Sequence, residues 1–203
     1  MDAKKETIAA YDAFADRFDA EYERHMRRYN LMHADAFADA LPGRSVLDIG
    51  AGPGNHAAYF ASKGLDVLCG DLSAEMVALC ARKGLPAIRL DLERFGLPET
   101  FDGIWANACL LHLPKASIPD VLERIARHLE PRGVLGCAVK EGEGERLEAD
   151  DDYPGVRRRF SYFADDEFRG LLFGRFVIER FERTPTRTGK TVFLKYVARL
   201  RPS

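Results

Sequence analysis

The sequence predicts an α/β protein built on one mostly parallel β-sheet with helices on both faces. Between residues 45 and 139, short apolar runs rich in β-branched residues alternate with helical patterns, and this alternation is typical of βαβ units. The chain has 203 residues, of which 46% are hydrophobic and 31% are charged. This length and composition predict a single globular domain, and they exclude a disordered chain.

The elements are expected in a definite order. Apolar residues recur at helical spacing from Ile8 to Tyr22 and again over residues 30–41, so the chain should begin with helices. The expected strands cover residues 45–49, 65–69, 87–90, 101–107 and 133–139, and the expected helices cover residues 55–63, 73–83 and 117–129. A helix over residues 164–173 precedes two strands over residues 176–181 and 191–200. Because no helix separates these last two strands, they must pair antiparallel as a hairpin.

These elements divide the domain, residues 1–203, into four parts: a helical N-terminal cap over residues 1–41, a core over 42–140, a loop segment over 141–163, and a helix with a C-terminal β-hairpin over 164–203. The loop is expected because seven acids and two glycines fall within Glu141–Asp152.

The charges are balanced overall but unevenly distributed. The net charge of −2 gives no case for generic attraction to nucleic acid or to a membrane. Residues 157–203 nevertheless carry 12 basic and 5 acidic residues, so the excess of acid lies in the rest of the chain. The first residues lack a signal-peptide core and no apolar run is long enough to span a membrane, so we expect a cytoplasmic protein.

Cysteine and histidine do not form metal-binding patterns. The four cysteines are far apart and fit neither a C-x-x-C pair nor a disulfide scaffold, which favours reduced thiols. The five histidines form no H-E-x-x-H or comparable cluster. We therefore expect no metal site.

A glycine-rich loop follows the first expected strand and precedes a helix, in the order Gly50-Ala51-Gly52-Pro53-Gly54. Glycines allow positive φ and a close approach of a ligand, and the N-terminus of the next helix offers a partial positive charge to an anion. Asp71 ends the next strand about 20 residues later, where a carboxylate is placed to accept both hydroxyls of a ribose. A cofactor that contains a nucleoside is indicated, either a dinucleotide or S-adenosylmethionine. The Asn at position 55 departs from the dinucleotide pattern G-x-G-x-x-G.

The whole set of motifs resembles the class I S-adenosylmethionine-dependent methyltransferases, specifically small bacterial enzymes of the ubiquinone/menaquinone methyltransferase type. The resemblance is carried, over nearly all of residues 9–201, by VLDIGAGPGNHA, GDLSAEMV, LDLERF, FDGIWANACLLHLP, PRGVL and the closing hairpin. It implies a three-layer α/β/α Rossmann-like sheet of seven strands in the order 3-2-1-4-5-7-6, with the last strand antiparallel. It also implies S-adenosylmethionine as the cofactor.

The same resemblance assigns the cofactor-binding residues. The backbone cradle for the methionine part would consist of Gly50, Ala51, Gly52 and Gly54. Asp48 would reach its amino group, directly or through water, and Asn107 would offer a carbonyl to it. Asp71 would bind the ribose, and Asp48 and Asp71 have the alternative of capping helices.

Further residues are assigned to the adenine and to the cover of the site. Leu72 and Met76 would pack on the adenine, with a role in the core as the alternative. Asp91, followed by Leu92, would accept from the adenine amine or would form a plain turn. Tyr11 belongs to a prefix that resembles the helix covering the cofactor.

His112 is the candidate general base. It follows the fourth strand on the carboxyl edge of the sheet, where substrates bind in this architecture, and histidine titrates in a suitable range. The alternative is that it only packs against the loop or hydrogen-bonds to it. His56 and His128 are expected on helix surfaces.

The motifs that are absent favour a small-molecule methyl acceptor, at O, N or C, over nucleic acid. After the fourth strand, the chain lacks the N/D-P-P-Y/F/W stretch of enzymes that methylate base amino groups, and Cys109 lacks the adjacent proline of C5 methylation. Two segments remain to shape the acceptor pocket. They are residues 140–163, with Arg157-Arg158-Arg159-Phe160, and a prefix set of aromatic and basic residues: Tyr11, Phe14, Phe18, Tyr22, Arg24, Arg27, Arg28 and Tyr29.

Three other functions stay open at this point: an NAD-dependent oxidoreductase on a similar sheet, an RNA methyltransferase that uses the basic C-terminal part, and a cofactor-binding partner protein without turnover. The sequence also leaves open whether the protein is a monomer or a homodimer. The arginine cluster has the alternative of being the charged face of a strand, satisfied by the neighbouring acids.

Overall fold

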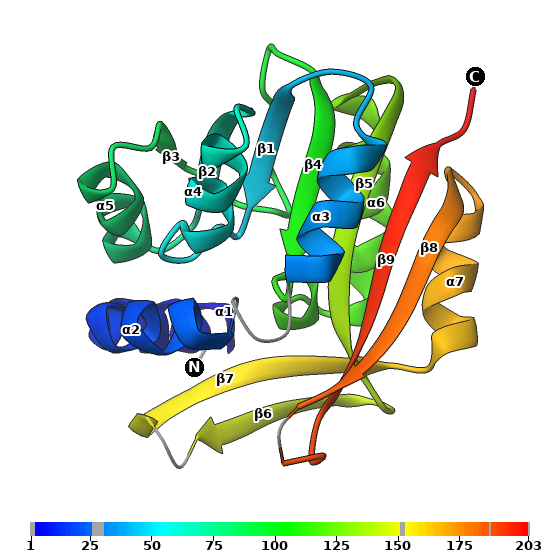
Figure 1. Cartoon of the computed structure of the whole chain (residues 1–203). Helices are drawn as coiled ribbons and strands as arrows, with labels where there is room; N and C mark the ends of the chain where they lie inside the picture. The colour runs from blue at the N-terminus through cyan, green and yellow to red at the C-terminus, as the bar shows by residue number, and fades with distance from the viewer. Residues whose placement is uncertain (1–2, 26–30, 151–152, 187, 203) are drawn as a thin grey trace.

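The computed structural model describes residues 3–25, 31–150, 153–186 and 188–202. Nine strands of these residues form a twisted sheet, and helices lie on both of its faces (Figure 1). The strands are β1 (Ser45–Ile49), β2 (Asp66–Asp71), β3 (Ala87–Arg89), β4 (Phe101–Asn107), β5 (Leu129–Glu141), β6 (Glu145–Asp150), β7 (Tyr153–Phe163), β8 (Phe176–Pro185) and β9 (Val192–Leu200). The helices are α1 (Ala3–Ala13), α2 (Ala15–His25), α3 (Leu31–Ala40), α4 (Asn55–Ser62), α5 (Ala74–Arg82), α6 (Ile118–Arg127) and α7 (Asp165–Phe173), with 3-10 turns η2 (Leu110–His112) and η3 (Lys115–Ser117).

The predicted order of the main sheet is confirmed as β3-β2-β1-β4-β5-β9-β8. The first five of these strands are parallel, and β9 runs antiparallel to both β5 and β8. The carboxyl ends of β1, β2 and β4 therefore lie on one edge, which faces α1 and α2 (Figure 1).

The sequence prediction was wrong for the segment 141–163, which was expected to be a loop. Its described residues form a second hairpin, in which β6 and β7 pair antiparallel from Glu145↔Ser161 to Ala149↔Arg157. Glu148 of β6 lies opposite Arg158 of β7, and Arg159 of β7 lies 3.6 Å from Glu145 of β6. Opposite charges across two strands favour pairing. These two strands raise the number from seven to nine.

The helical prefix also differs from the expectation, because its first part forms two helices. A turn at Phe14 separates α1 from α2. The backbone N–H of Arg159 in β7 donates to Thr7 Oγ1 in α1 over 3.0 Å, so the prefix and the β6–β7 hairpin lie side by side (Figure 1).

The two faces of the sheet have separate cores. On one face, Phe37 of α3 and Phe60 of α4 pack against Trp105 of β4, with ring centroids 5.0 and 5.3 Å apart. On the other face, α6 and α7 cover β5 and β9, and Phe168 packs on Tyr196. The expectation of surface positions for His56 and His128 is wrong, because both side chains are at most 9% exposed. His56 packs against Trp105, with ring centroids 5.2 Å apart.

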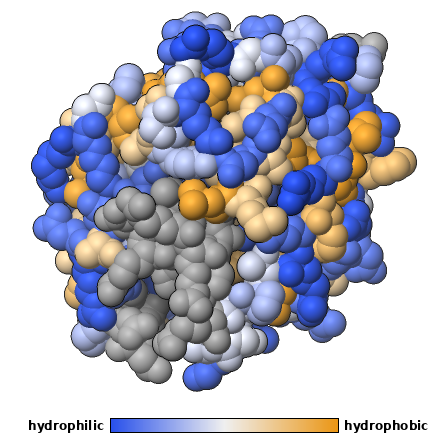
Figure 2. All heavy atoms as spheres, viewed as in Figure 1, coloured by the Kyte–Doolittle hydropathy of each residue, from blue (hydrophilic) through white to orange (hydrophobic). Residues whose placement is uncertain are grey.

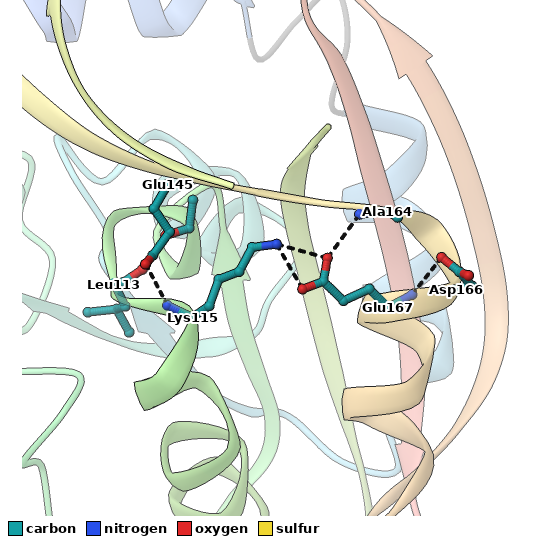
Figure 3. Close-up of polar contacts among 7 residues, drawn as sticks. Leu113, Lys115, Glu145, Ala164, Asp166 and Glu167 are labelled. Atoms are coloured by element: carbon teal, nitrogen blue, oxygen red, sulfur yellow. Dashed lines mark hydrogen bonds and ion pairs between the residues drawn. The ribbon is translucent and has the colours of Figure 1, made fainter. Parts of the chain in front are cut away.

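A polar network joins the β6–β7 hairpin to the loop after β4. The backbone N–H of Lys115 donates to Glu145 in β6, while its ammonium group bridges both oxygens of Glu167 in α7 (Figure 3). Ser161 Oγ donates to the Leu113 carbonyl over 2.6 Å. These contacts join η3 and the residue Leu113 before it to β6, β7 and α7, so the network holds the loop that carries His112 against the hairpin.

The face drawn in Figure 2 is largely hydrophilic, with hydrophobic areas between the polar side chains. Among the described residues, no helix is long and apolar enough to cross a membrane.

Gly136 provides a test of the packing between β4, β5 and α3. A Cβ at this position would lie 2.4 Å from Trp105 Cε3 and 2.8 Å from Phe37 Cδ2, and both side chains are fully buried. We expect Gly136→Ala to lower the free energy of unfolding by about 1–3 kcal/mol, measured by urea denaturation, because the core must shift to admit the methyl group.

The matched control is Gly170→Ala in α7, where a Cβ meets nothing within 4 Å. It should raise the free energy of unfolding by about 0.5–1 kcal/mol, because alanine favours the helix. Equal effects of the two substitutions would contradict this account of the core.

Candidate functional site

The loop between β1 and α4 needs glycine for two separate reasons. Gly50, Gly52 and Gly54 all have positive φ, at 64°, 55° and 80°. Gly50 also packs so tightly that a Cβ would lie 2.3 Å from the Cβ of Cys109 in the loop after β4. Any side chain at position 50 would push these two loops apart, which explains why the motif begins with glycine.

Asp71 connects this loop with the end of β2. Its carboxylate accepts hydrogen bonds from the backbone N–H of Gly52 over 2.8 Å and of Ser73 over 2.9 Å. Burial raises the pKa of Asp71, while the same two N–H groups oppose the rise. Ser73 caps α5 through Met76 N, so Asp71 lies between two helix N-termini.

A cavity of about 450 Å³ opens over this edge of the sheet, between the core and the layer formed by α1, α2 and β7. The structure brings eleven predicted residues together in its wall: Tyr11, Gly50, Ala51, Gly52, Asp71, Leu72, Met76, Asp91, Leu92, Asn107 and His112. Two others do not line it. Asp48 lies under the loop with 2% exposure, and Gly54 is the N-cap residue of α4.

Two buried acceptors lie near the loop. Among the described residues, Asp48 Oδ2 and Asn107 Oδ1 have no hydrogen-bond partner. Asn107 uses its amide nitrogen to donate to the Tyr22 hydroxyl over 2.8 Å. Burial raises the pKa of Asp48 well above its usual range. This arrangement suits a ligand that brings hydrogen-bond donors to the loop.

Asp91 has a partner that the sequence did not predict. The ammonium group of Lys4 in α1 binds both carboxylate oxygens of Asp91, over 2.7 and 2.8 Å, and also Glu93 over 2.7 Å. Lys4 and Asp91 are 87 positions apart in the sequence, so no local pattern could reveal the pair. The ion pairs join the start of α1 to the edge of the cavity.

His112 is held at both ring nitrogens. Nδ1 lies 2.7 Å from the carbonyl oxygen of Arg159, and Nε2 lies 2.7 Å from the Tyr11 hydroxyl. A carbonyl can only accept, so Nδ1 carries the proton and Nε2 accepts from Tyr11. Tyr11 in turn accepts from the Arg158 guanidinium over 3.3 Å. Burial lowers the pKa of His112 to about 3, so its ring is neutral near pH 7.

The other end of the cavity is formed by β5, β7, β8, β9 and the turn between the last two strands. We call this part of the wall the far end; its polar residues are Lys140, Arg158, Lys195, Thr184, Thr186 and Thr191. Lys195 and these threonines were missed by the sequence analysis. The available signal was a lysine inside the otherwise apolar strand VFLKYVARL.

The three arginines of the cluster Arg157–Arg159 have different surroundings. Arg157 binds Glu6 over 2.9 Å and Arg159 lies 3.6 Å from Glu145, as expected if neighbouring acids satisfy the cluster. Arg158 points into the cavity instead. Arg27, Arg28 and Tyr29, also considered for the acceptor pocket, lie outside the described residues, as does the side chain of Arg24.

The fold and the site together define a nucleotide-cofactor-binding α/β domain. No group of three or more His, Cys, Asp or Glu that could hold a metal ion occurs within the described residues. All four cysteines are buried free thiols.

Comparison with known proteins agrees with this class. Residues 46–133 match a family model described as a methyltransferase domain. The malonyl-[acyl-carrier protein] O-methyltransferase of Enterobacter lignolyticus is 29% identical over 187 residues, which cover 87% of this chain and 72% of that protein. The Salmonella typhimurium protein of the same name is 32% identical, and this chain spans about half of its length, 52%.

A solved structure covers nearly the whole fold. The 1,6-didemethyltoxoflavin-N1-methyltransferase of Burkholderia thailandensis, bound to 1,6-didemethyltoxoflavin and S-adenosylhomocysteine, superposes with a TM-score of 0.74 and 25% identity. The match covers 100% of this chain and 92% of that protein. These matches support a class I S-adenosylmethionine-dependent methyltransferase family, with S-adenosylmethionine as the cofactor.

The buried histidines predict a pH dependence of stability. Burial lowers the pKa of His56, as of His33 and His112, to about 3 from the ordinary value of 6.5. When the pH falls below 6.5, the unfolded chain binds protons that the folded protein does not bind, so each histidine lowers the free energy of unfolding. This loss continues down to a pH of about 3.

The variant His56→Asn isolates one of these groups, because the other titrating groups are common to both proteins. Between pH 7.5 and pH 5, the stability of the wild-type protein relative to the variant should fall by about 2 kcal/mol, measured by urea denaturation. A difference that does not change with pH would contradict a neutral, buried His56.

Proposed function

We propose that the protein transfers the methyl group of S-adenosylmethionine to a small-molecule acceptor bound in the cavity. The observation that carries this proposal is the position of the cavity: it begins at the glycine loop and continues to the far end, under α1, α2 and β7. A volume of about 450 Å³ lies in the range of small-molecule sites.

The residues around the loop fit the proposed cofactor. We assign the methionine part to the backbone of Gly50–Gly54 and the ribose to Asp71. The unpartnered oxygen of Asn107 suits the cofactor's amino group, and that of Asp48, which does not line the cavity, suits contact through water. The bound cofactor supplies a methyl group on a positively charged sulfur, which is a good leaving group.

The adenine is assigned to Leu72, Met76 and Leu92, with Asp91 at its amine. Met76 is only 1% exposed and packs with α2 residues, so it forms a rigid wall at this position. The Asp91 carboxylate has about four lone-pair positions. It accepts two contacts from Lys4 and one from the Glu93 N–H, which leaves capacity for a further donor.

His112 is proposed to act through Tyr11. With its Nε2 accepting from the Tyr11 hydroxyl, the neutral ring fixes the direction of that O–H group inside the cavity. Arg158 binds the same oxygen from the other side. Under this proposal His112 is a positioning residue, and the Tyr11 oxygen is the group that meets the acceptor.

The charge distribution does not favour RNA as the acceptor. Several basic residues of the C-terminal part form ion pairs with acids, including Arg183 with Glu141 and Arg199 with Glu179. Their charge is therefore not presented as a continuous basic strip for a phosphate backbone.

The names of the similar proteins include both a carrier-protein acceptor and a small-molecule acceptor, so they do not select one. They specify a malonyl-[acyl-carrier protein] for two of them and 1,6-didemethyltoxoflavin for the third. These acceptors differ in chemistry, so the acceptor of this chain must be found by experiment.

Isotope transfer tests the proposed function. The protein is incubated with methyl-labelled S-adenosylmethionine and a bacterial extract that has been separated into small-molecule, RNA and protein fractions. We expect label in the small-molecule fraction. Transfer confined to the RNA or protein fraction, or no transfer by a protein that binds S-adenosylhomocysteine, would overturn the proposal.

The negative control is Asp71→Ala, which should weaken S-adenosylhomocysteine about ten- to hundredfold in calorimetry, because a hydrogen-bonded carboxylate is lost from the ribose. The matched control Asp66→Ala removes an exposed acid from the start of the same strand and should leave the affinity unchanged.

If Tyr11 and His112 act as proposed, substitution of either residue should lower turnover without lowering the affinity for the cofactor. Tyr11→Phe keeps the ring and removes the hydroxyl, and it should lower kcat about ten- to hundredfold with S-adenosylhomocysteine affinity within about twofold of wild type. His112→Asn should lower kcat to a similar extent. The double variant should have a kcat only slightly lower than that of either single variant.

The control for this pair is Tyr59→Phe, which removes a tyrosine hydroxyl that binds Asp35 outside the cavity wall. The pH profile of kcat provides a separate readout, since a neutral His112 should produce no inflection near pH 6.5. Full turnover by Tyr11→Phe, or such an inflection, would disprove the positioning role.

A further inference from the structure

We infer that the methyl acceptor is an organic anion of the carboxylic acid class, and that Lys195, with Arg158 and Lys140, binds its carboxylate at the far end of the cavity. This inference deepens the proposed function and rests on it. Its evidence is the charge and position of three cationic side chains that come from three different strands.

Strand register places Lys195 on the same sheet face as the cofactor-binding edge. Asn107 of β4 pairs with Ala138 of β5, and Ala138 pairs with Lys195 of β9. Residues opposite each other in register project to the same face of the sheet, and all three side chains line the cavity. At a strand spacing of about 4.8 Å, Lys195 begins about 10 Å from Asn107.

Ala138, which lies between Asn107 and Lys195 in the sheet, leaves space above it for a ligand. Ala138 ends at a methyl group, so no side chain fills the space between Asn107 and Lys195 from the middle strand. A small acceptor placed above Ala138 would have the loop and its cofactor on one side. The ammonium group of Lys195 would lie on the other side.

Lys195 is an unusual residue for a structural role. Its side chain is 2% exposed, and burial lowers its pKa, while the charge of Glu182 opposes this effect. Glu182 lies opposite Lys195 in register on β8, and one of its oxygens also accepts from Thr184. Keeping a lysine inside a strand is costly, and a bound anion would offset part of that cost.

The other two cations are held by aromatic rings. Lys140 Nζ lies 3.3 Å from the centroid of Phe160, and the Arg158 guanidinium lies 5.2 to 5.5 Å from the centroids of Tyr11, Phe18 and Phe160. An aromatic face attracts a cation and fixes its position but does not cancel its charge. Lys140 and Arg158 thus place two cationic groups in the cavity wall.

The acids of the cavity wall belong to its other end. Asp71 and Asp91 lie with the glycine loop and the proposed cofactor, and Glu21 pairs with Arg17 on α2. Among the described residues, no acid lines the far end, which carries three cations and three threonines. This part of the site selects for negative charge in the acceptor.

Matched ligands test the inference without requiring the true acceptor. The protein is saturated with S-adenosylhomocysteine and titrated in a calorimeter with benzoate, phenylacetate and succinate, and with the uncharged amide of each acid. We expect at least one carboxylate to bind about tenfold more tightly than its amide, since a charge-assisted hydrogen bond is lost in the amide. Equal binding of acid and amide in every pair would overturn the inference.

Substitutions locate the anion. Lys195→Gln should weaken the preferred carboxylate about tenfold, and Lys195→Arg should restore most of the affinity, while the affinity for S-adenosylhomocysteine stays within about twofold. Lys190→Gln is the matched control, because Lys190 is an exposed lysine of the same hairpin outside the cavity wall. If Lys195→Gln does not fold, Lys140→Gln provides the same comparison.

Two other results would also overturn the inference. One is a loss of S-adenosylhomocysteine affinity in Lys195→Gln as large as the loss for the carboxylate, which would assign the lysine to the cofactor. The other is tighter binding of benzylphosphonate than of any carboxylate, which would replace the acceptor class. Failure of the proposed function is distinguishable, because it would appear as absent cofactor binding or absent small-molecule labelling in the wild-type protein.

Discussion

The close contact between the loop after β1 and the loop after β4 is the constraint on which the rest of the site depends. Gly50 lies against Cys109 with no room for a Cβ, and Gly50 N and Ala51 N both donate to the carbonyl of Gly70 in β2. One short segment is thus fixed by two neighbouring strand ends. Because Asp71 follows Gly70 directly and binds the Gly52 N–H, the carboxylate and the loop cannot move independently.

The interior behind this contact is polar, which is unusual for the core side of a sheet. His33 and His56 pack on Trp105. Asp48 of β1 pairs in register with Trp105, and Asn107 lies two positions further along β4. Burial lowers the pKa of both histidines to about 3, so their rings are neutral near pH 7. Repulsion from the charge of Lys195 also lowers the pKa of His33 and His56.

The pattern of apolar and polar residues along the chain predicted those features that depend on neighbouring residues in the sequence. The strands Ser45–Ile49 and Phe101–Asn107 have the expected bounds, and the strand-end rule placed Asp71 and His112 at the cavity. The segment after Glu141 was misjudged because acidic composition indicates solvation, whereas its strands are stabilised by arginines that lie some ten positions later on β7. Lys195 was missed for the same reason, since register across β4, β5 and β9 cannot be read from one strand.

The far end of the cavity lies where β5 pairs with a further strand. β5 pairs with β9 from Val134 to Lys140, and at Lys140 and Glu141 it also pairs with β7. β9 and β7 meet β5 at this point and then diverge (Figure 1). Lys140, Lys195 and Arg158 come from these three strands and line the cavity. The pairing of β5 with both β9 and β7 therefore brings the three cations together. A sheet with only the seven main strands would lack Arg158 and the cover that β7 provides.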